Sequence, residues 1–389
     1  MKKKFKVHLL IESSRAAGRD LLKGIARYAR LHGDWSFYWE TGGLEANVSA
    51  RKSLDVDGII SRDLTVSRAL MRRTDIPAVV VGHRDREARG LINVLTDSQA
   101  VGRMAAEHLL NCGFKHFAFC GLARMNHEQT PWSGERMKSF AARIQAARFA
   151  APEKFVLHAH ATDWKSSRRR LADWLMKLPR PVGILACNDD CGAQVAEACK
   201  LAGLAVPDEA GLVGVDNDEV VCGLSDPPMS SVALNFEQAG YAAARALDRL
   251  MRGGRQRPAD IIVAPTHLVT RRSTDAVAVD DERVGRALRF IRNHTRQPFS
   301  VNEVAAAAGV SRRALERRFR ETMGVSLLQE IRRARTDEIA RLLLETNLPV
   351  AEIAGTLGFG DSQHIARYFY AAKKTSPLAF RRRQGKPAH

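Results

Sequence analysis

The chain has 389 residues, of which 61 are Lys or Arg and 43 are Asp or Glu, giving a formal net charge of +18. Its length allows two or three domains, and its 45% hydrophobic content is enough for ordinary buried cores. Because no stretch approaches the roughly 20 apolar residues of a membrane span, and the run from Val7 to Ile11 is too short for a signal-peptide core, we expect a cytoplasmic protein without a membrane partner.

Residues 5 to about 271 alternate short apolar runs with segments of helical periodicity. Alternating strands and helices predict parallel sheets with right-handed crossovers. The result is an open α/β fold, which binds ligands beyond the carboxyl ends of its strands. The runs expected as strands are 6–11, 35–39, 58–60, 78–81, 117–119, 155–157, 183–186 and 211–215.

Polar residues stand at the carboxyl ends of four expected strands, in segments 12–15, 82–85, 188–190 and 216–218. Four polar strand ends in one fold suggest one shared site. A sugar suits such a site, because the planar groups of Asp, Asn and Arg hold hydroxyls in fixed directions. An aromatic ring can cover the apolar face of the sugar.

Several segments resemble the sugar-binding domain of the lactose-repressor family, itself similar to periplasmic sugar-binding proteins. The resemblance implies a two-lobed sensor with the sugar between its lobes. That family carries a helix-turn-helix at its N-terminus, whereas this chain opens directly on the first expected strand. The resembling runs are 94–97 before an expected helix at 98–111, then 187–190, 214–217, 227–232 and 236–240.

Candidate sugar contacts come from this resemblance and from the strand ends. The family's contacts carry over by motif to Arg136, Asn188 and Asp216. Trp132, one helical turn before Arg136, is the candidate stacking face. Asn188 or Asp216 could instead cap the following helix, and Trp132 could belong to the core. With two further strand-end residues, the candidates are Arg15, Asp85, Trp132, Arg136, Asn188 and Asp216.

Motifs for other function classes are weak. The α/β segment has no phosphate-cradling glycine loop, no Gly-x-Ser-x-Gly elbow and no His-Glu-x-x-His pair, which argues against an enzyme. Cys187 with Cys191, or His158 with His160, could bind a metal, but neither pair has partners at zinc spacing. We therefore expect six reduced, structural cysteines and no metal or cofactor. A transport binding protein is the other class considered.

Residues 280–389 carry one short pattern twice: a small apolar helix, a glycine turn and a polar, basic helix. A helix-turn-helix needs a small residue where its helices cross and a glycine that tolerates the tight turn. Ala305 with Gly309 and Ala354 with Gly358 meet those needs. Two copies predict two DNA-reading helices on one chain. The expected helices are 301–308, 311–319, 350–357 and 362–369.

The outer face of each reading helix is expected to contact DNA. Leu315 with Phe319, and Ile365 with Phe369, are spaced four apart and face inward. Outward arginines can hold guanine bidentately or reach phosphate. The alternative is that both helices are merely solvated surface. The residues expected at DNA are Arg312, Arg313, Glu316, Arg317, Ser362, Gln363, His364, Arg367 and Lys373.

Charge and capping agree with this interpretation. Residues 280–389 hold 21 Lys and Arg against 12 Asp and Glu, and the first 279 residues hold 40 against 31. Phosphate attraction supplies affinity that falls with salt, and base-edge contacts supply sequence choice. Ser311 and either Asp361 or Ser362 are the expected N-caps of the reading helices. Arg382 and Arg383 could join the phosphate contacts or form a solvated tail.

This C-terminal segment resembles the DNA-binding domain of the arabinose-regulator (AraC) family. In that family one long helix joins the two helix-turn-helix units. The matching helix is expected at 327–344, and the implied organisation is a sensor at 1–271, a polar linker at 272–280 and a double helix-turn-helix domain at 281–389. The inward stripe of the long helix is expected at Leu328, Ile331, Ile339, Leu342 and Leu343.

The combination of these two domain types is similar to the xylose-operon activators of enteric bacteria. That similarity implies a sugar-responsive activator of pentose use. Its partners would be double-stranded operator DNA, a pentose such as xylose, a second copy of the chain and, for an activator, RNA polymerase. Closure of the lobes on the sugar would re-aim the DNA-binding domains of the dimer. The alternatives are that the sugar alters only dimerisation, or that the effector is another sugar.

Overall fold

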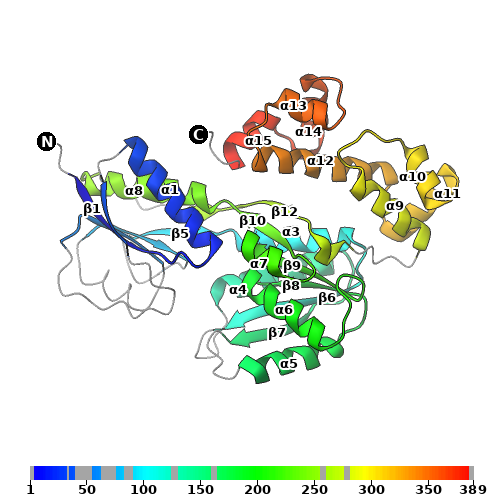
Figure 1. Cartoon of the computed structure of the whole chain (residues 1–389), viewed down its shortest axis with the longest axis horizontal. Coiled ribbons are helices and arrows are strands. Elements are labelled where there is room, and N and C mark those ends of the chain that lie inside the picture. Colours follow the sequence, from blue (N-terminus) through cyan, green and yellow to red (C-terminus); the bar gives the residue numbers. More distant parts are fainter. Residues whose placement is uncertain are drawn as a thin grey trace. The chain divides into compact units, whose positions relative to one another are not determined.

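The computed structural model describes residues 4–32, 35–39, 55–62, 76–82, 91–123, 130–158, 164–254, 260–275 and 281–384. The chain divides into two compact units, residues 1–100 with 234–265 and residues 101–233 with 266–389. The first unit is the first lobe of the sensor. The second unit contains the second lobe, residues 101–233 and 266–275, and the C-terminal helices, which we call the reader, residues 281–384 (Figure 1).

The first lobe is built on a six-stranded sheet in the order β11-β5-β4-β3-β1-β2, and every described pair in it is parallel. Helices α1 and α8 pack closely, because a Cβ atom on Gly24 would lie 2.0 Å from the carbonyl oxygen of Glu237. Its elements are β1 Phe5–Leu10, α1 Ala16–His32, β2 Trp35–Trp39, β3 Gly58–Arg62, β4 Ala78–Val81, β5 Ile92–Thr96, α8 Phe236–Met251 and β11 Ile261–Val263.

The second lobe repeats the architecture with a sheet in the order β12-β10-β9-β8-β6-β7. Phe114 packs beneath this sheet, where a Cβ atom on Gly211 would lie 2.3 Å from its ring. Its elements are α3 Ser98–Asn111, β6 His116–Ala123, α4 Pro131–Ala146, β7 Glu153–His158, α5 Trp164–Met176, β8 Val182–Ala186, α6 Asp189–Leu201, β9 Ala210–Asp216, α7 Glu219–Leu224, β10 Ser230–Leu234, β12 Pro265–Val269 and the 3-10 turn η1 Arg272–Thr274.

The reader is all-helical and has two hydrophobic cores, one for each helix-turn-helix unit. Leu315 and Phe319 are buried in the first core, and Ile365 and Phe369 in the second, as the spacing predicted. Its helices are α9 Glu282–Asn293, α10 Val301–Ala308, α11 Arg312–Met323, α12 Leu327–Glu345, α13 Val350–Thr356, α14 Ser362–Lys373 and α15 Pro377–Gln384.

The predicted fold class is confirmed, with two differences in detail. Leu328, expected in the inward stripe of the long helix, is 48% exposed, and the buried residue at this end is its neighbour Leu327. Ser273 and Thr274, expected in the linker, are buried in η1 against β9. The second lobe therefore extends beyond Arg271, because a buried turn belongs to the lobe that buries it.

Candidate effector site and DNA-binding surface

Arg136 brings together several predicted residues of the second lobe. It is 3% exposed on α4, and its guanidinium donates a hydrogen bond to the carbonyl oxygen of Cys187. The same guanidinium lies 3.9 Å from a carboxylate oxygen of Asp216. Strands β8 and β9 are parallel neighbours, so Asn188 and Asp216 occupy the same carboxyl edge of the sheet. A buried cation beside a carboxylate at this edge can hold a polyhydroxyl ligand.

Trp132 lies against this cation. The guanidinium carbon of Arg136 is 4.8 Å from the centroid of the Trp132 ring, which is within the range of a cation–π contact. Trp132 is half-buried, so it is not a core residue. The guanidinium occupies part of the ring, and a stacking role for Trp132 on a sugar stays a prediction.

Asn188 and Asp216 differ in how far their side chains serve the fold. Asn188 is the N-cap of α6, and its Oδ1 accepts a hydrogen bond from the backbone N–H of Cys191 at 2.9 Å. A sugar contact from Asn188 would come from its Nδ2 or from the second lone pair of Oδ1. Asp216 is not the cap of the next helix, because Asp218 fills that position.

The backbone at Asp216 is strained. Asp216 has φ 104° and Asn217 has φ 51°, both in the left-handed region that side chains with a Cβ atom rarely adopt. Two such residues in succession persist only where the surrounding structure over-determines them, and they concentrate at ligand sites. The strain falls at the end of β9, where the sequence predicted a sugar contact.

Sequence reasoning missed Asp189, which stands next to Asn188. Its carboxyl is buried and accepts hydrogen bonds from Ser231 Oγ at 2.6 Å and from the N–H of Asp218 at 2.7 Å. Burial, together with the negative charge of Asp216, raises the pKa of Asp189 to about 8. The two hydrogen bonds tie the start of α6 to β10 and to the loop between β9 and α7. The run 188–190 showed polarity but not which residue faces inward.

In the first lobe, the structure places Arg15 on an exposed loop between β1 and α1. Nη1 of Arg19 donates to the carbonyl oxygens of Ser13 and Ser14, at 3.1 and 3.0 Å, and thereby fixes that loop. The predicted residue Asp85 lies outside the described residues.

A second feature of the first lobe was also missed. Glu12 is buried after β1, and one of its carboxylate oxygens lies 2.8 Å from Nη2 of Arg62, the last residue of β3. Strands β1 and β3 are neighbours, so this ion pair lies at the carboxyl edge of the first sheet. A polar run at 12–15 is visible in the sequence, but only the fold pairs Glu12 with Arg62.

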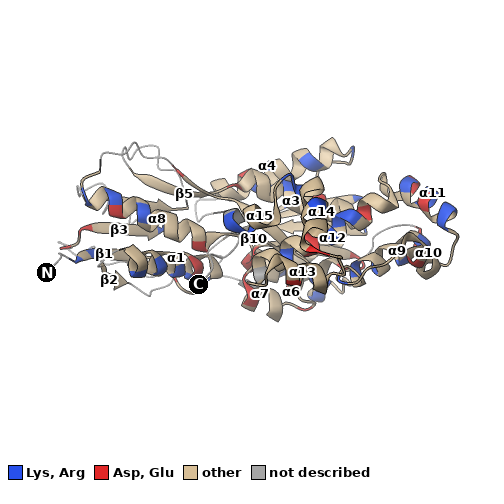
Figure 2. Ribbon diagram, turned by 90° about the horizontal axis from the view of Figure 1, so that it is seen from above, with Lys and Arg blue, Asp and Glu red and all other residues tan. Residues whose placement is uncertain are grey.

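All the predicted DNA-facing residues of the first helix-turn-helix unit are exposed on α11. Ser311 is its N-cap, as expected, with Oγ accepting from the N–H of Ala314 at 3.4 Å. Arg312 and Glu316 form an ion pair of 2.9 Å along the helix, whereas Arg313 and Arg317 have no ion pair among the described residues. Figure 2 shows basic residues gathered along α11.

In the second unit the predicted residues are likewise exposed on α14. Asp361 is the N-cap and accepts from the N–H of His364 at 2.6 Å, so Ser362 is the first helical residue. The His364 ring packs edge-on against Phe359, with centroids 5.2 Å apart. That contact fixes the direction in which His364 points. Arg367 remains on the outer face of the helix.

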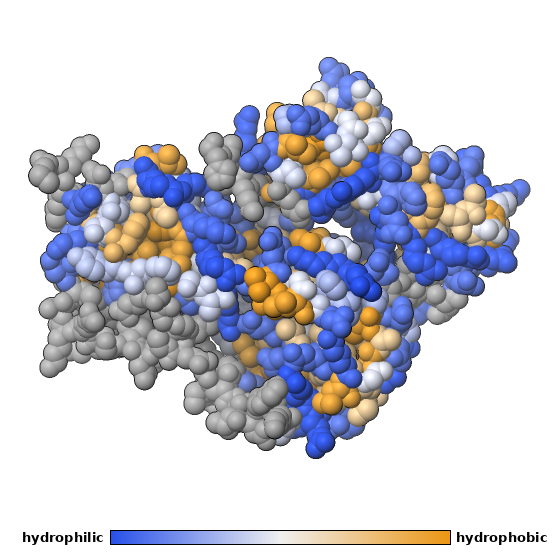
Figure 3. All heavy atoms as spheres, viewed as in Figure 1, coloured by the Kyte–Doolittle hydropathy of each residue, from blue (hydrophilic) through white to orange (hydrophobic). Residues whose placement is uncertain are grey.

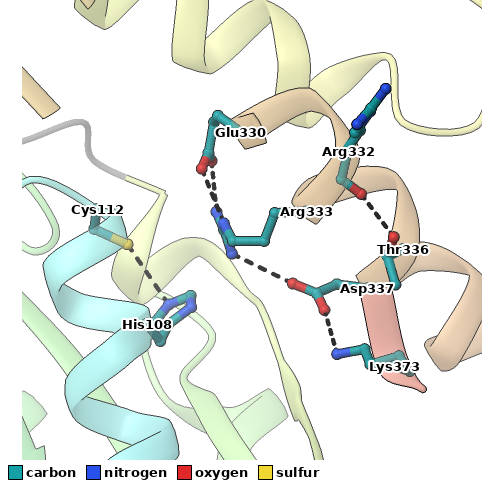
Figure 4. A network of polar contacts seen from close by, with 8 residues as sticks. All are labelled: His108, Cys112, Glu330, Arg332, Arg333, Thr336, Asp337 and Lys373. Carbon is teal, nitrogen blue, oxygen red and sulfur yellow. Dashed lines mark hydrogen bonds and ion pairs between the residues drawn. The ribbon is translucent and has the colours of Figure 1, made fainter. Parts of the chain in front are cut away.

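Lys373 is less available than the sequence indicated. Its Nζ lies 3.0 Å from a carboxylate oxygen of Asp337 on α12, and the other oxygen of Asp337 lies 3.3 Å from Arg333 (Figure 4). Arg333 also pairs with the buried carboxylate of Glu330. A phosphate contact by Lys373 would therefore compete with an existing ion pair.

The structure also bears on the cysteines, on metal binding and on membrane spans. All six cysteines are unbridged and buried, and Cys187 Sγ lies 3.4 Å from Cys191 Sγ. Across the described ranges, no group of three or more metal-binding side chains was found. Across the same ranges, no helix combines the length and hydrophobicity needed to cross a bilayer.

Comparisons with known proteins agree with this arrangement. A periplasmic binding protein-like domain matches residues 106–274, and a helix-turn-helix domain matches residues 304–383. The xylose operon regulatory protein of Escherichia coli K12 is 30% identical over 385 residues, 97% of each chain. That of Haemophilus influenzae is 28% identical and covers 97% of this chain and 98% of its own. The structure of a xylose-binding transcription activator aligns with a TM-score of 0.62 at 29% identity, covering 99% of this chain and all of that one.

The fold, the two helix-turn-helix units and these matches define a sugar-responsive transcription regulator with a periplasmic-binding-protein-like sensor. The chain belongs to the family of xylose operon regulatory proteins.

Proposed function

We propose that this chain is a cytoplasmic activator of pentose-utilisation genes that responds to D-xylose and binds operator DNA as a homodimer. The observation that carries the effector assignment is the pair formed by buried Arg136 and strained Asp216, 3.9 Å apart. The choice of xylose as the sugar is supported by the 30% identity with a xylose operon regulatory protein over nearly the whole chain. The proposed role is binding without turnover of the sugar.

The proposed response is a shift between conformations. A sugar that contacts polar residues of both lobes makes all its contacts only when the lobes close, and so it favours the closed state. Closure in each protomer would re-aim the readers of the dimer. The alternative, that the sugar changes only the dimerisation constant, predicts a sugar-dependent molecular mass at micromolar protein. Light scattering with and without D-xylose distinguishes the two.

The effector is tested with Asp216→Ala in the full-length protein, followed by thermal shift against D-xylose, other pentoses and hexoses. Loss of a charged acceptor that holds sugar hydroxyls costs on the order of 2 to 3 kcal/mol, enough to remove the shift. Asp173→Ala, an exposed aspartate on α5, is the matched control and should keep it. Normal xylose binding by Asp216→Ala would show that the pocket lies elsewhere.

The DNA-binding proposal concerns two exposed arginines, one in each helix-turn-helix unit: Arg317 on α11 and Arg367 on α14. Each should read bases in its own major-groove segment, with the segments about one helical turn, roughly 34 Å, apart. Arg317→Ala and Arg367→Ala should each relax base preference at a separate group of positions, by about 1 to 3 kcal/mol. Selection from random DNA measures this. If each variant loses affinity for all sequences alike and its base preference is unchanged, these helices contact only phosphate and do not read bases.

The homodimer is supported by an apolar surface on α7, where Val220 is 61% and Leu224 is 82% exposed. An apolar patch lies over α7 in Figure 3. Such patches mark protein contacts more often than plain surface. Leu224→Glu should shift the mass measured by light scattering toward the monomer, whereas Leu201→Glu on α6, also exposed, should leave it unchanged. RNA polymerase is the further partner that activation requires, and in vitro transcription with xylose tests it.

A further inference from the structure

The strained end of β9 is held from outside the sheet by Arg271. Its Nη2 donates a hydrogen bond of 2.8 Å to Oδ1 of Asn217, and its Nη1 donates one of 2.9 Å to the carbonyl oxygen of Met229. Asn217 also donates its N–H to Ser231 Oγ at 3.0 Å. The left-handed conformation at residues 216 and 217 is thus fixed by one guanidinium and one hydroxyl.

Arg271 is itself anchored in the second lobe. Its N–H donates to Ser230 Oγ at 2.8 Å, and that hydroxyl lies 3.1 Å from the Arg271 carbonyl oxygen. Because the backbone is fixed on β10, movement of Asn217 would pull on the Arg271 side chain or break its hydrogen bond. Either event changes the restraint on the segment that Arg271 begins.

That segment leads to the reader. Residues 271–275 include η1 and precede residues 276–280 and then α9. Ser273 Oγ donates to the carbonyl oxygen of Leu212 on β9 at 2.6 Å and accepts from the N–H of Ser230 at 2.8 Å. Thr274 Oγ1 lies 2.7 Å from Ser230 Oγ. The start of the connector is therefore bonded to β9, which ends at the strained residues, and to its neighbouring strand β10.

We propose that Arg271 is a positioning residue that couples the effector contact at Asp216 to the connector of the reader, through its hydrogen bond to Asn217. This inference rests on the proposed effector site. A sugar hydroxyl bound by Asp216 changes the forces on two strained residues. Arg271 passes that change to residues 271–275, the last described residues before the reader.

A simpler role for Arg271 is a structural lock on the loop, with no part in the response. The two roles differ in what happens when only the Arg271–Asn217 bond is removed. If Arg271 is only a lock, replacing it removes the lock. The ratio of operator affinities with and without sugar then stays at the wild-type value in any variant that still binds sugar. Coupling by definition appears in that ratio.

The test compares full-length wild type with Asn217→Gly and Arg271→Met. Asn217→Gly removes the acceptor, glycine adopts the positive φ without strain, and the N–H of residue 217 can still donate to Ser231 Oγ. Arg271→Met removes the donor and retains the aliphatic bulk. Arg272→Met is the matched control, because Arg272 is the exposed neighbour in η1. Two quantities are measured: D-xylose affinity by calorimetry and operator affinity with and without saturating D-xylose.

In the wild type, coupling between sites usually changes affinity by about 5- to 150-fold. Both Asn217→Gly and Arg271→Met should bring the operator ratio to within about twofold of one, while operator affinity without sugar changes by less than about twofold. Arg272→Met should keep the wild-type ratio. A wild-type ratio in sugar-saturated Asn217→Gly would overturn the inference, even if Arg271→Met has lost sugar binding altogether.

A measurement without sugar keeps this inference separable from the proposed function. Hydrogen exchange in peptides covering residues 271–275 should be faster in Asn217→Gly than in wild type, because the loop no longer restrains Arg271. Unchanged exchange there would also refute the link. If wild type binds no sugar while exchange does rise, the effector assignment fails and the physical link between loop and connector stands.

Discussion

The two helix-turn-helix units of the reader have the same inner framework but are closed in different ways. Gly309 and Gly358 both have φ 69°, and Ala305 and Ala354 are both buried where the helices cross. The first unit is fixed at its helix starts. Ser300 and Glu303 form a capping box on α10, and Asp281 caps α9 while pairing with Arg318 of α11 at 2.9 Å.

The second unit is instead fixed by arginines that bind backbone carbonyls. Arg335 donates to the carbonyl oxygen of Leu357 at the end of α13, and its guanidinium carbon lies 4.6 Å from the Phe359 ring centroid. Arg381 donates to the carbonyls of Leu343 and Leu348, at 3.0 and 2.6 Å. These carbonyls lie near helix ends, where backbone acceptors lack intrahelical partners.

The difference shows that a repeated sequence pattern specifies the core of each unit but not its closure. It also shows that arginine density overstates DNA contact. Arg318, Arg335 and Arg381 all bind other parts of the reader. Part of the basic charge of this region therefore serves the fold, and only the structure shows which arginines do so.

The largest expected contrast is between alanine substitutions at the two turn glycines. A Cβ atom at Gly358 would lie 2.5 Å from Cδ of Pro298, whereas at Gly309 the nearest atom is 3.9 Å away, on Arg286. Gly309→Ala should cost about 1 kcal/mol of left-handed strain, and Gly358→Ala roughly 2 to 4 kcal/mol because of the added overlap.

Hydrogen exchange in peptides of α10–α11 and α13–α14 measures this contrast. Tryptophan fluorescence cannot, because all five tryptophans precede residue 175. Equal losses for the two variants would mean that Pro298 moves aside, and the contrast in the turns would then disappear.

Arg335→Met tests closure by an arginine. It removes the donor to Leu357 and the cation over Phe359 but keeps the aliphatic stem, and should destabilise the second unit by about 1 to 3 kcal/mol. Exchange should rise in α13–α14 and stay unchanged in α10–α11. Arg332→Met, exposed on the same helix, is the control. A rise in both units would mean that Arg335 supports the whole reader.

The two N-cap aspartates give a smaller contrast. The carboxylate of Asp281 accepts hydrogen bonds from two backbone N–H groups and from the Arg318 guanidinium, whereas that of Asp361 accepts one of 2.6 Å from the N–H of His364. Asp281→Ala should cost about 1 kcal/mol or somewhat more in the first unit, and Asp361→Ala should cost the second unit less. Far-UV circular dichroism during urea unfolding compares the variants. A larger effect of Asp361→Ala would contradict the assignment of the stronger cap to Asp281.

Both caps also predict a pH dependence. Burial opposes ionisation of Asp281, but the Arg318 bond and the helix N–H groups outweigh it and lower its pKa below 3.8. The N–H of His364 lowers the pKa of Asp361 likewise. Their contributions are therefore fully present above about pH 4 and are lost as the pH falls through each lowered pKa. Variants without the carboxylates should lose less stability between pH 5 and 2, measured by the same unfolding curves.

The smallest expected contrast is between neighbouring lysines at the end of α14. Lys374 is the exposed C-cap, whereas Lys373 pairs with Asp337. If both face phosphate, Lys374→Ala should lower the salt slope of operator binding by about one, and Lys373→Ala by less, because its ion pair already offsets the charge. Operator titrations at several salt concentrations measure both. If Lys373→Ala also lowers the salt slope by about one, the ion pair between Lys373 and Asp337 must break when the protein binds DNA.

Much of the fold was predictable because alternation and helical spacing are local signals. The runs at 35–39 and 78–81 coincide with β2 and β4. Strand β10 was missed because it starts with Ser230 and Ser231, whose hydroxyls bond with Thr274 in η1 and with Asp189. Strands β11 and β12 are short, and pairing with distant strands makes them part of the sheets.

The site was predictable only in part. Strand ends and motif resemblance pointed to Arg136 and Asp216, which the structure brings within 3.9 Å of each other. The roles of Asp189, Arg271 and the pair Glu12–Arg62 depend on contacts between residues far apart in sequence. Burial and hydrogen-bond partners of that kind have no signature in a single sequence, because any polar residue beside a strand has the same pattern.

The contact of Gly358 with Pro298 has a consequence for the DNA itself. It seats the turn of the second unit on the segment between α9 and α10 of the first, and we expect this contact to hold the two reading helices at a fixed separation. A stiff reader cannot adjust the distance between its two helices. The duplex must then supply the adjustment by bending or twisting, and the energy of that deformation depends on the DNA sequence. Base pairs between the two contacted segments should therefore influence operator strength even though no side chain touches them.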